Sequence, residues 1–131
     1  DACKESGAKR AMQLAVSAPF HCQLMQPAAN QMSKLLRNIE FHEPKIAVLQ
    51  NVNADFVSDP RQIRENLVSQ MSSAVLWSTT IERMVRESVA QIVECGPGKI
   101  LSGLNRRIDR SIDSMSISSS DSLDSVIGIL G

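Results

Sequence analysis

Residues 89–110 read VAQIVECGPGKILSGLNRRIDR, and this stretch decides the fold class. Its first part, VAQIVEC, is a short apolar run of the kind that forms a buried strand in a parallel sheet. GPGK follows as a glycine turn, and a helical pattern then runs from Ile100 to Arg110. A strand that leads directly into a helix is the unit from which α/β domains with parallel strands are built.

The same kind of unit recurs on both sides of this stretch. Towards the C-terminus, SMSIS predicts a strand and DSLDSVIGIL predicts a short helix capped by Ser or Asp. The eight serines from Ser111 to Ser125 also suit a disordered segment, but the regularly placed apolar residues among them favour a folded strand and helix.

Towards the N-terminus, helical and strand patterns alternate in the same way. The sequence predicts a strand over 9–18 (KRAMQLAVSA), a helix over 24–39, a strand over 45–52 (KIAVLQNV), a helix that begins at Asp59-Pro60, and a helix over 77–87. DACKESG, before the first of these strands, has the pattern of an exposed helix end. Because helices alternate with strands, the predicted fold class is α/β with mostly parallel strands.

Composition sets broad limits on function. The chain has 131 residues, enough for one compact domain, and 43% of them are apolar. Fourteen basic side chains balance fourteen acidic ones, which argues against a nucleic-acid-binding protein that relies on bulk charge. No apolar run approaches the roughly 20 residues that cross a bilayer, and no signal-peptide pattern opens the chain. We therefore expect neither nucleic acid nor membrane as a partner.

The cysteines and histidines offer little for a metal. Three cysteines, Cys3, Cys22 and Cys95, form an odd number at wide spacings, which is typical of reduced thiols in a cytoplasmic protein. The candidate metal ligands are His21, Cys22, His42 and Cys95, but no two of them have a recognised ligand spacing. We expect no metal site.

His21 is the residue most open to a chemical role. It lies in SAPFHCQLMQP, residues 17–27, where a predicted strand gives way to a helix, and catalytic side chains are often displayed at such junctions. A general base needs a nucleophile, and no GxSxG elbow occurs in the chain. By itself, an isolated histidine is more often a packed side chain than a base. The neighbouring Cys22 is more often a small buried apolar residue than a nucleophile.

The glycine turn and the helix after it leave two further alternatives open. GPGK stands where phosphate-binding loops occur, but it lacks the spacing of a P-loop, so a tight strand–helix turn is the better interpretation. Arg106, Arg107 and Arg110 form a basic face on the following helix. This face suits a solvated helix C-terminus, and with Lys99 it also suits a docking patch for an acidic protein.

Four segments, taken in order, resemble one family. They are KRAMQLAVSAPFHCQLMQPAA, KIAVLQNV, VSQMSSAVLW and ECGPGKILSGLNRRI, and together they are similar to the C-terminal part of malonyl-CoA:acyl-carrier-protein transacylases. The resemblance covers essentially the whole chain. It implies an α/β-hydrolase-like core with an inserted ferredoxin-like subdomain. Residues 1–16 would then end the small subdomain, including its last strand, and residues 17–131 would form the C-terminal part of the catalytic subdomain.

The resemblance also implies a reaction, with malonyl-CoA and acyl carrier protein as partners and no cofactor. A serine takes the malonyl group from CoA, and the phosphopantetheine thiol of acyl carrier protein then takes it from the serine. His21 matches the catalytic histidine of the family, and Gln70 matches the residue whose main-chain oxygen orients that histidine. Phe20 matches a position where phenylalanine accompanies malonyl and serine accompanies methylmalonyl in related acyltransferases.

Other parts of the family pattern do not occur in these residues. The GHSxG elbow, the arginine that pairs with the malonyl carboxylate and the glutamine-rich oxyanion segment all precede the matching region in the family. We therefore expect the chain to need the N-terminal half of the same enzyme, to be inactive alone, and to expose apolar surface that promotes self-association. The alternative is a non-catalytic module that docks an acidic carrier protein through Lys99 and the three arginines.

Overall fold

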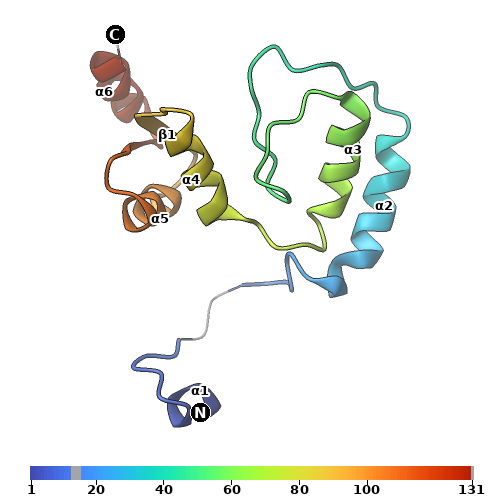
Figure 1. Ribbon diagram of the computed structural model, residues 1–131, viewed down its shortest axis with the longest axis horizontal. Coiled ribbons are helices and arrows are strands. Elements are labelled where there is room, and N and C mark those ends of the chain that lie inside the picture. Colours follow the sequence, from blue (N-terminus) through green and yellow to red (C-terminus); the bar gives the residue numbers. More distant parts are fainter. Residues whose placement is uncertain (13–15, 131) are drawn as a thin grey trace.

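The structure is a computed structural model that describes residues 1–12 and 16–130 (Figure 1). Its elements, in chain order, are helix α1 (Ala2–Glu5), the 3-10 helix η1 (Gln23–Met25), helices α2 (Gln26–Leu36), α3 (Pro60–Ser69) and α4 (Trp77–Arg86), strand β1 (Gln91–Cys95), helix α5 (Ile100–Ile108), strand β2 (Asp113–Ile117) and helix α6 (Ser120–Leu130). None of these helices has the length and apolar character that crossing a bilayer requires. Within the described ranges, α1 packs against no other helix or strand.

The two strands form a parallel sheet, which confirms the predicted α/β class. Gln91 pairs with Asp113, and the register continues to Cys95 opposite Ile117. Helix α5 connects the strands and packs on both of them, and α6 packs on β2. The predicted strands at 89–95 and 114–118 and the helices that follow each of them are thus all present, with ends shifted by at most two residues.

Two helix–helix contacts carry the rest of the packing. Helix α2 lies against α3, with Ala29 and Leu36 buried on α2. Helix α4 lies against α5, where Ile81 is fully buried. At the same contact, the indole Nε1 of Trp77 donates a 3.0 Å hydrogen bond to Oδ1 of the buried Asn105.

Helix α3 begins where its sequence predicts. The carboxylate of Asp59 accepts a 2.9 Å hydrogen bond from the main-chain N–H of Arg61, and Pro60 occupies the first helical position. At the other end of the chain, Ser119 and Ser122 cap α6 reciprocally, because each hydroxyl accepts a hydrogen bond from the main-chain N–H of the other residue.

The strand predicted over 45–52 is wrong. Only an isolated antiparallel bridge forms there, between Leu49 and Phe56, and the side chain of Ile46 is 78% exposed. A strand needs a neighbour along its hydrogen-bonding edge, and apolar character alone does not supply one. The strand predicted over 9–18 falls partly outside the described residues, at 13–15, and its described flanks form no strand.

The turn after β1 is built by glycine and by a carboxylate. Gly96 and Gly98 adopt φ values of 149° and 99°, which side-chain-bearing residues rarely adopt. Glu94 on β1 accepts hydrogen bonds at the start of α5 from the main-chain N–H groups of Leu101 (3.1 Å) and Ser102 (2.9 Å). Glu94 thereby fills the positions that a phosphate would use, so the tight-turn interpretation of GPGK is the better one.

The hydroxyl of Ser102 extends this contact to the second strand. Its Oγ lies 2.8 Å from the Glu94 carboxylate and 3.0 Å from the main-chain oxygen of Met115 on β2. Because a hydroxyl has one proton, it donates to one of these acceptors at a time. The hydrogen bonds from Ser102 and Leu101 hold the pKa of the Glu94 carboxyl below its ordinary value.

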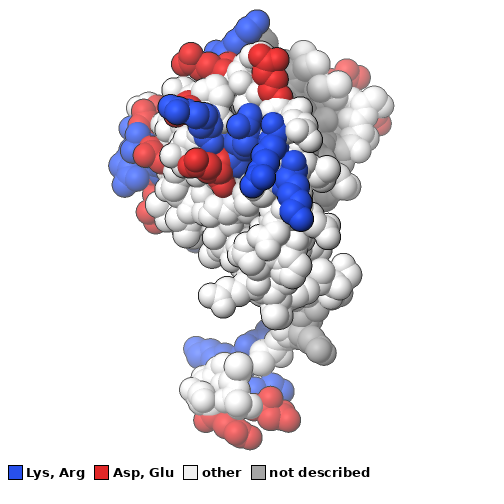
Figure 2. All heavy atoms as spheres, turned by 90° about the vertical axis from the view of Figure 1, so that its right-hand side faces the viewer, with Lys and Arg blue, Asp and Glu red and all other residues white. Residues whose placement is uncertain are grey.

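The surface of the molecule is large for its length. The accessible area is 9836 Å², whereas a compact monomer of this size exposes about 6,800 Å². Large apolar side chains contribute to this area, among them Leu24 and Ile100, which are each 74% exposed. On the face drawn in Figure 2, basic and acidic side chains gather in the upper part and again at the lower end, and uncharged atoms cover the area between these two groups.

We expect Ser88→Gly to stabilise the chain by about 1 kcal/mol. Ser88 follows α4 with φ 63°, and the main-chain hydrogen bonds from Ser88 to Val85 and from Val89 to Met84 close the helix end in the way that usually takes glycine. The free energy of urea unfolding measures the effect. Ser78→Gly, inside the same helix, is the matched control and lowers stability; a loss of stability at Ser88 would contradict the prediction.

We expect Glu94→Gln to destabilise the chain at neutral pH and much less at acidic pH. A carboxyl whose pKa is lowered by folding stabilises the folded state above its unfolded pKa, and that stabilisation is lost as pH falls through the folded value. The difference in unfolding free energy between the wild type and the variant should therefore shrink below about pH 4. Urea unfolding at several pH values measures this. Glu82→Gln on α4 is the control, and an equal penalty at every pH would contradict the prediction.

Candidate functional site

His21 lies in a tight turn between Pro19-Phe20 and η1. Its φ is 59°, in the left-handed region, which costs a residue with a side chain about 1–2 kcal/mol. Histidine is among the residues enriched there. The thiol of Cys22 lies 3.2 Å from the main-chain oxygen of Pro19 and closes the turn. This strained turn displays the imidazole at the surface.

The imidazole of His21 contacts the end of helix α3. Its Nδ1 lies 2.9 Å from the main-chain oxygen of Gln70, 49 residues away in the sequence. Gln70 caps α3, and the last carbonyls of a helix have no partner inside it. A carbonyl only accepts hydrogen bonds, so Nδ1 donates, and the neutral ring then carries its lone pair on Nε2. This arrangement is suited to proton transfer at Nε2.

The side chain of Gln70 has a partner that the sequence did not indicate. Its Oε1 accepts a 3.1 Å hydrogen bond from Nδ2 of Asn51. The main-chain oxygen of Asn51 accepts a second one, 3.0 Å long, from the N–H of Leu76. The only signal in the sequence is that Asn51 comes near the end of the apolar run over 45–52, where polar residues are often displayed.

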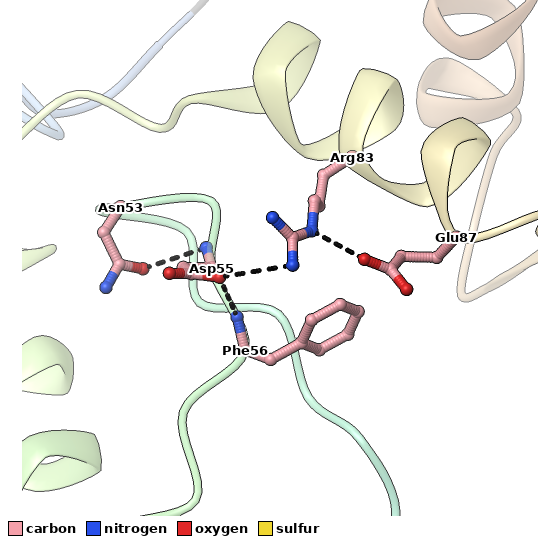
Figure 3. A network of polar contacts seen from close by, with 5 residues as sticks. All are labelled: Asn53, Asp55, Phe56, Arg83 and Glu87. Atoms are coloured by element: carbon pink, nitrogen blue, oxygen red, sulfur yellow. Dashed lines mark hydrogen bonds and ion pairs between the residues drawn. The ribbon is translucent and has the colours of Figure 1, made fainter.

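The loop that carries Asn51 is attached to helix α4 by Arg83 (Figure 3). The guanidinium lies 3.9 Å from Oδ1 of Asp55 and 3.0 Å from Oε1 of Glu87 on its own helix. It also lies over the ring of Phe56, 5.5 Å from the centroid. The carboxylate of Asp55 also accepts a 2.9 Å hydrogen bond from the main-chain N–H of Phe56. Arg83 therefore contacts two residues of the loop, Asp55 and Phe56.

The structure places the other candidate residues in two regions. Phe20 directly precedes His21 and is 56% exposed. Lys99 and Arg106 line an open hollow of about 470 Å³ between α5, β2 and α6. Arg106 also donates a 3.3 Å hydrogen bond to the main-chain oxygen of Ser114. Arg107 and Arg110 are exposed near the end of α5, so the basic residues are grouped around that helix.

The described residues contain no group of three or more His, Cys, Asp or Glu side chains that could hold a metal ion. The three cysteines are free thiols.

No family model matches the chain. Among curated relatives, the malonyl CoA-acyl carrier protein transacylase of Haemophilus influenzae is 44% identical over 124 residues, which cover 95% of this chain and 40% of the relative. The enzyme of the same name from Bacillus subtilis is 36% identical over 127 residues, again covering 40% of its length. The chain thus spans about 40% of the length of the curated relatives it matches.

Solved structures give the same result. An acyl carrier protein S-malonyltransferase from Vibrio cholerae superposes with a TM-score of 0.88 at 43% identity, over 95% of this chain and 40% of that one. A malonyl-transacylase in complex with its type II PKS acyl-carrier protein superposes with a TM-score of 0.91 at 39% identity, over 98% of this chain and 41% of that one.

Proposed function

The chain is homologous to one part of the malonyl CoA-acyl carrier protein transacylases, and we propose that it supplies the general base of such an acyltransferase. In this proposal, malonyl passes from CoA to a serine and then to the phosphopantetheine thiol of acyl carrier protein, as a step of fatty-acid synthesis. The serine belongs to the N-terminal half of the same enzyme. No cofactor is needed, because serine and histidine carry the acyl group and the proton.

One observation carries the proposal: the 2.9 Å contact between His21 Nδ1 and the main-chain oxygen of Gln70. In Ser-His enzymes, an acceptor on one ring nitrogen fixes the tautomer and leaves the other nitrogen as the base. The carbonyl of Gln70 suits this role without adding a second ionisable group. The peptide dipoles of α3 also place partial negative charge at its C-terminus, which favours the imidazolium formed during the reaction.

The proposed proton transfers balance over both halves of the reaction. Nε2 of His21 takes the proton of the serine hydroxyl as its oxygen attacks the thioester carbonyl. The imidazolium then protonates the sulfur of the departing CoA. In the second half, Nε2 takes the proton of the carrier thiol, whose sulfur attacks the malonyl-serine ester, and the serine oxygen recovers a proton as it leaves.

Phe20 is proposed to select the acyl group. It is adjacent to His21 and its ring is 56% exposed, so the ring is free to border an acyl group held at the base. An aromatic ring at this place occupies the room that an α-methyl substituent would need. Malonyl is therefore the proposed substrate over methylmalonyl.

We also propose the domain division and the location of the enzyme. Residues 1–16 would complete a ferredoxin-like subdomain, and residues 17–131 would belong to an α/β-hydrolase-like catalytic subdomain. The separation of α1 from the other described elements agrees with this division. Three free thiols suit a reducing compartment, so we propose a cytoplasmic enzyme.

The basic residues around α5 are proposed to dock the acyl carrier protein. Lys99 and Arg106 border one hollow, and Arg107 and Arg110 extend the positive charge to the exposed end of the helix. An acidic carrier would be attracted to this surface, mainly through its association rate. A relative solved together with its acyl-carrier protein supports such a partner. Docking without catalysis, through these same residues, is the alternative function.

In the full-length protein, we expect His21→Asn to lower kcat for malonyl transfer about 10²- to 10⁴-fold, the contribution of a general base. Asparagine also tolerates the left-handed backbone, so the turn is kept. A malonyl-transfer assay measures the loss, and His42→Asn, at an exposed histidine, is the control. Residues 1–131 alone should show no transfer. Full activity of His21→Asn would leave only the docking alternative.

Charge reversal at Arg107 and Arg110 should raise KM for the carrier about tenfold at low salt, with little change in kcat. These two side chains make no hydrogen bond within the described residues, so their reversal breaks none there. Arg106 is left unchanged because it donates a hydrogen bond to the main-chain oxygen of Ser114. The effect should shrink near 1 M salt, where the screening length is about 3 Å. Lys34→Glu on α2 is the matched control. Equal KM values for both variants would contradict the docking proposal.

A further inference from the structure

Asn51 joins two ends of one segment. Its side chain donates to Oε1 of Gln70 at 3.1 Å, and its main-chain oxygen accepts from the N–H of Leu76 at 3.0 Å. Residues 70–76 link α3 to α4 and begin with the carbonyl that contacts His21. Asn51 therefore binds both ends of this linker: Gln70 through its side chain and Leu76 through its main-chain oxygen.

We propose that Asn51 is a positioning residue for His21 and acts through Gln70. This inference rests on the proposed role of His21 as the base. The direction of the Gln70 carbonyl depends on the torsion angles of a half-buried residue at a helix end, where helices fray and water competes for the free carbonyl. The amide–amide hydrogen bond from Asn51 restricts those torsions, so the carbonyl keeps pointing at Nδ1 of His21.

The backbone of α3 supports the same peptide group from the other side. The carbonyl of Gln70 and the N–H of Met71 belong to one peptide unit, and this N–H donates to the main-chain oxygen of Val68 at 3.2 Å. The N–H of Gln70 itself donates to Asn66 at 2.9 Å. Helix α3 thus holds the backbone on both sides of Gln70, and Asn51 supplies the hydrogen bond to its side chain.

Asn51 can do this because its own loop is firmly held. The main-chain bonds from Gln50 to Asp55 and from Ala54 to Gln50 close the loop, and both Gln50 and Ala54 are buried. Arg83 then attaches Asp55 and the neighbouring ring to α4 (Figure 3). A donor on a rigid loop can orient its acceptor, whereas a donor on a mobile side chain would only follow it.

The test is Asn51→Ala in the full-length protein. We expect kcat for malonyl transfer to fall about 3- to 10-fold, the effect of losing one hydrogen bond, with KM for malonyl-CoA unchanged. Histidine-selective ¹⁵N NMR without substrate gives a second readout, with His21 identified by comparison with His21→Asn. The population of the Nδ1–H tautomer of His21 should fall, and its ring proton should exchange faster with water.

Two further variants separate positioning from general destabilisation. Asn51→Asp keeps the contact if the Gln70 amide turns to donate to the carboxylate, so its kcat should stay near wild type. Gln62→Ala is the matched control, because Gln62 makes an amide–amide hydrogen bond of the same length, 3.1 Å, to Asn66 within α3. It should change neither kcat nor the His21 signals.

A double-mutant cycle completes the test. Gln70→Ala removes the side chain but keeps the main-chain oxygen, so it should lower kcat as much as Asn51→Ala, and the double variant should show no further loss. The inference would be overturned if the losses in kcat of the two single variants multiplied in the double variant. It would also be overturned by an Asn51→Ala protein with unchanged kcat and an unchanged His21 tautomer. If the full-length protein transferred no malonyl group, the proposed function would fail, and the substrate-free NMR comparison would still decide the role of Asn51.

Discussion

Backbone groups at helix ends need partners from outside the helix, and this constraint organises the molecule. Glu94 on β1 accepts hydrogen bonds from the free N–H groups at the start of α5, and His21 donates a hydrogen bond to the carbonyl at the end of α3. In both cases the partner comes from another element, so satisfying a helix end also fixes a tertiary contact. The proposed chemistry and the central turn of the sheet therefore have the same physical origin.

The sequence predicts the elements whose signals are local. The glycine turn and the Asp59-Pro60 helix start are found in place, because each depends on neighbouring residues only. The apolar run of β1 is also found as a strand, because β2 lies beside it. The run over 45–52 carries the same apolar signal as β1 but forms one bridge, since pairing depends on a neighbouring strand. His21 and Gln70 are indicated by resemblance. Asn51 is not, because its importance lies in a contact with a residue 19 positions away.

The open surface and the length of the relatives are consistent with each other. An accessible area of 9836 Å² and side chains such as Ile46 and Leu24, which are mostly exposed, indicate faces that a larger protein would cover. The relatives are about two and a half times as long as this chain, which spans 40% of them. Under the proposed function, the remaining part of the enzyme packs on these faces and brings the serine to His21.

The register of the sheet has a consequence for the chain entropy of folding. Gln91 pairs with Asp113 only 22 positions later, so β1, α5 and β2 close on themselves through short-range contacts. The contact between His21 and Gln70 spans 49 positions and requires α3 to be complete. Short-range contacts form at a lower entropic cost than long-range ones. Closing the sheet therefore costs less chain entropy than bringing the imidazole of His21 to the end of α3.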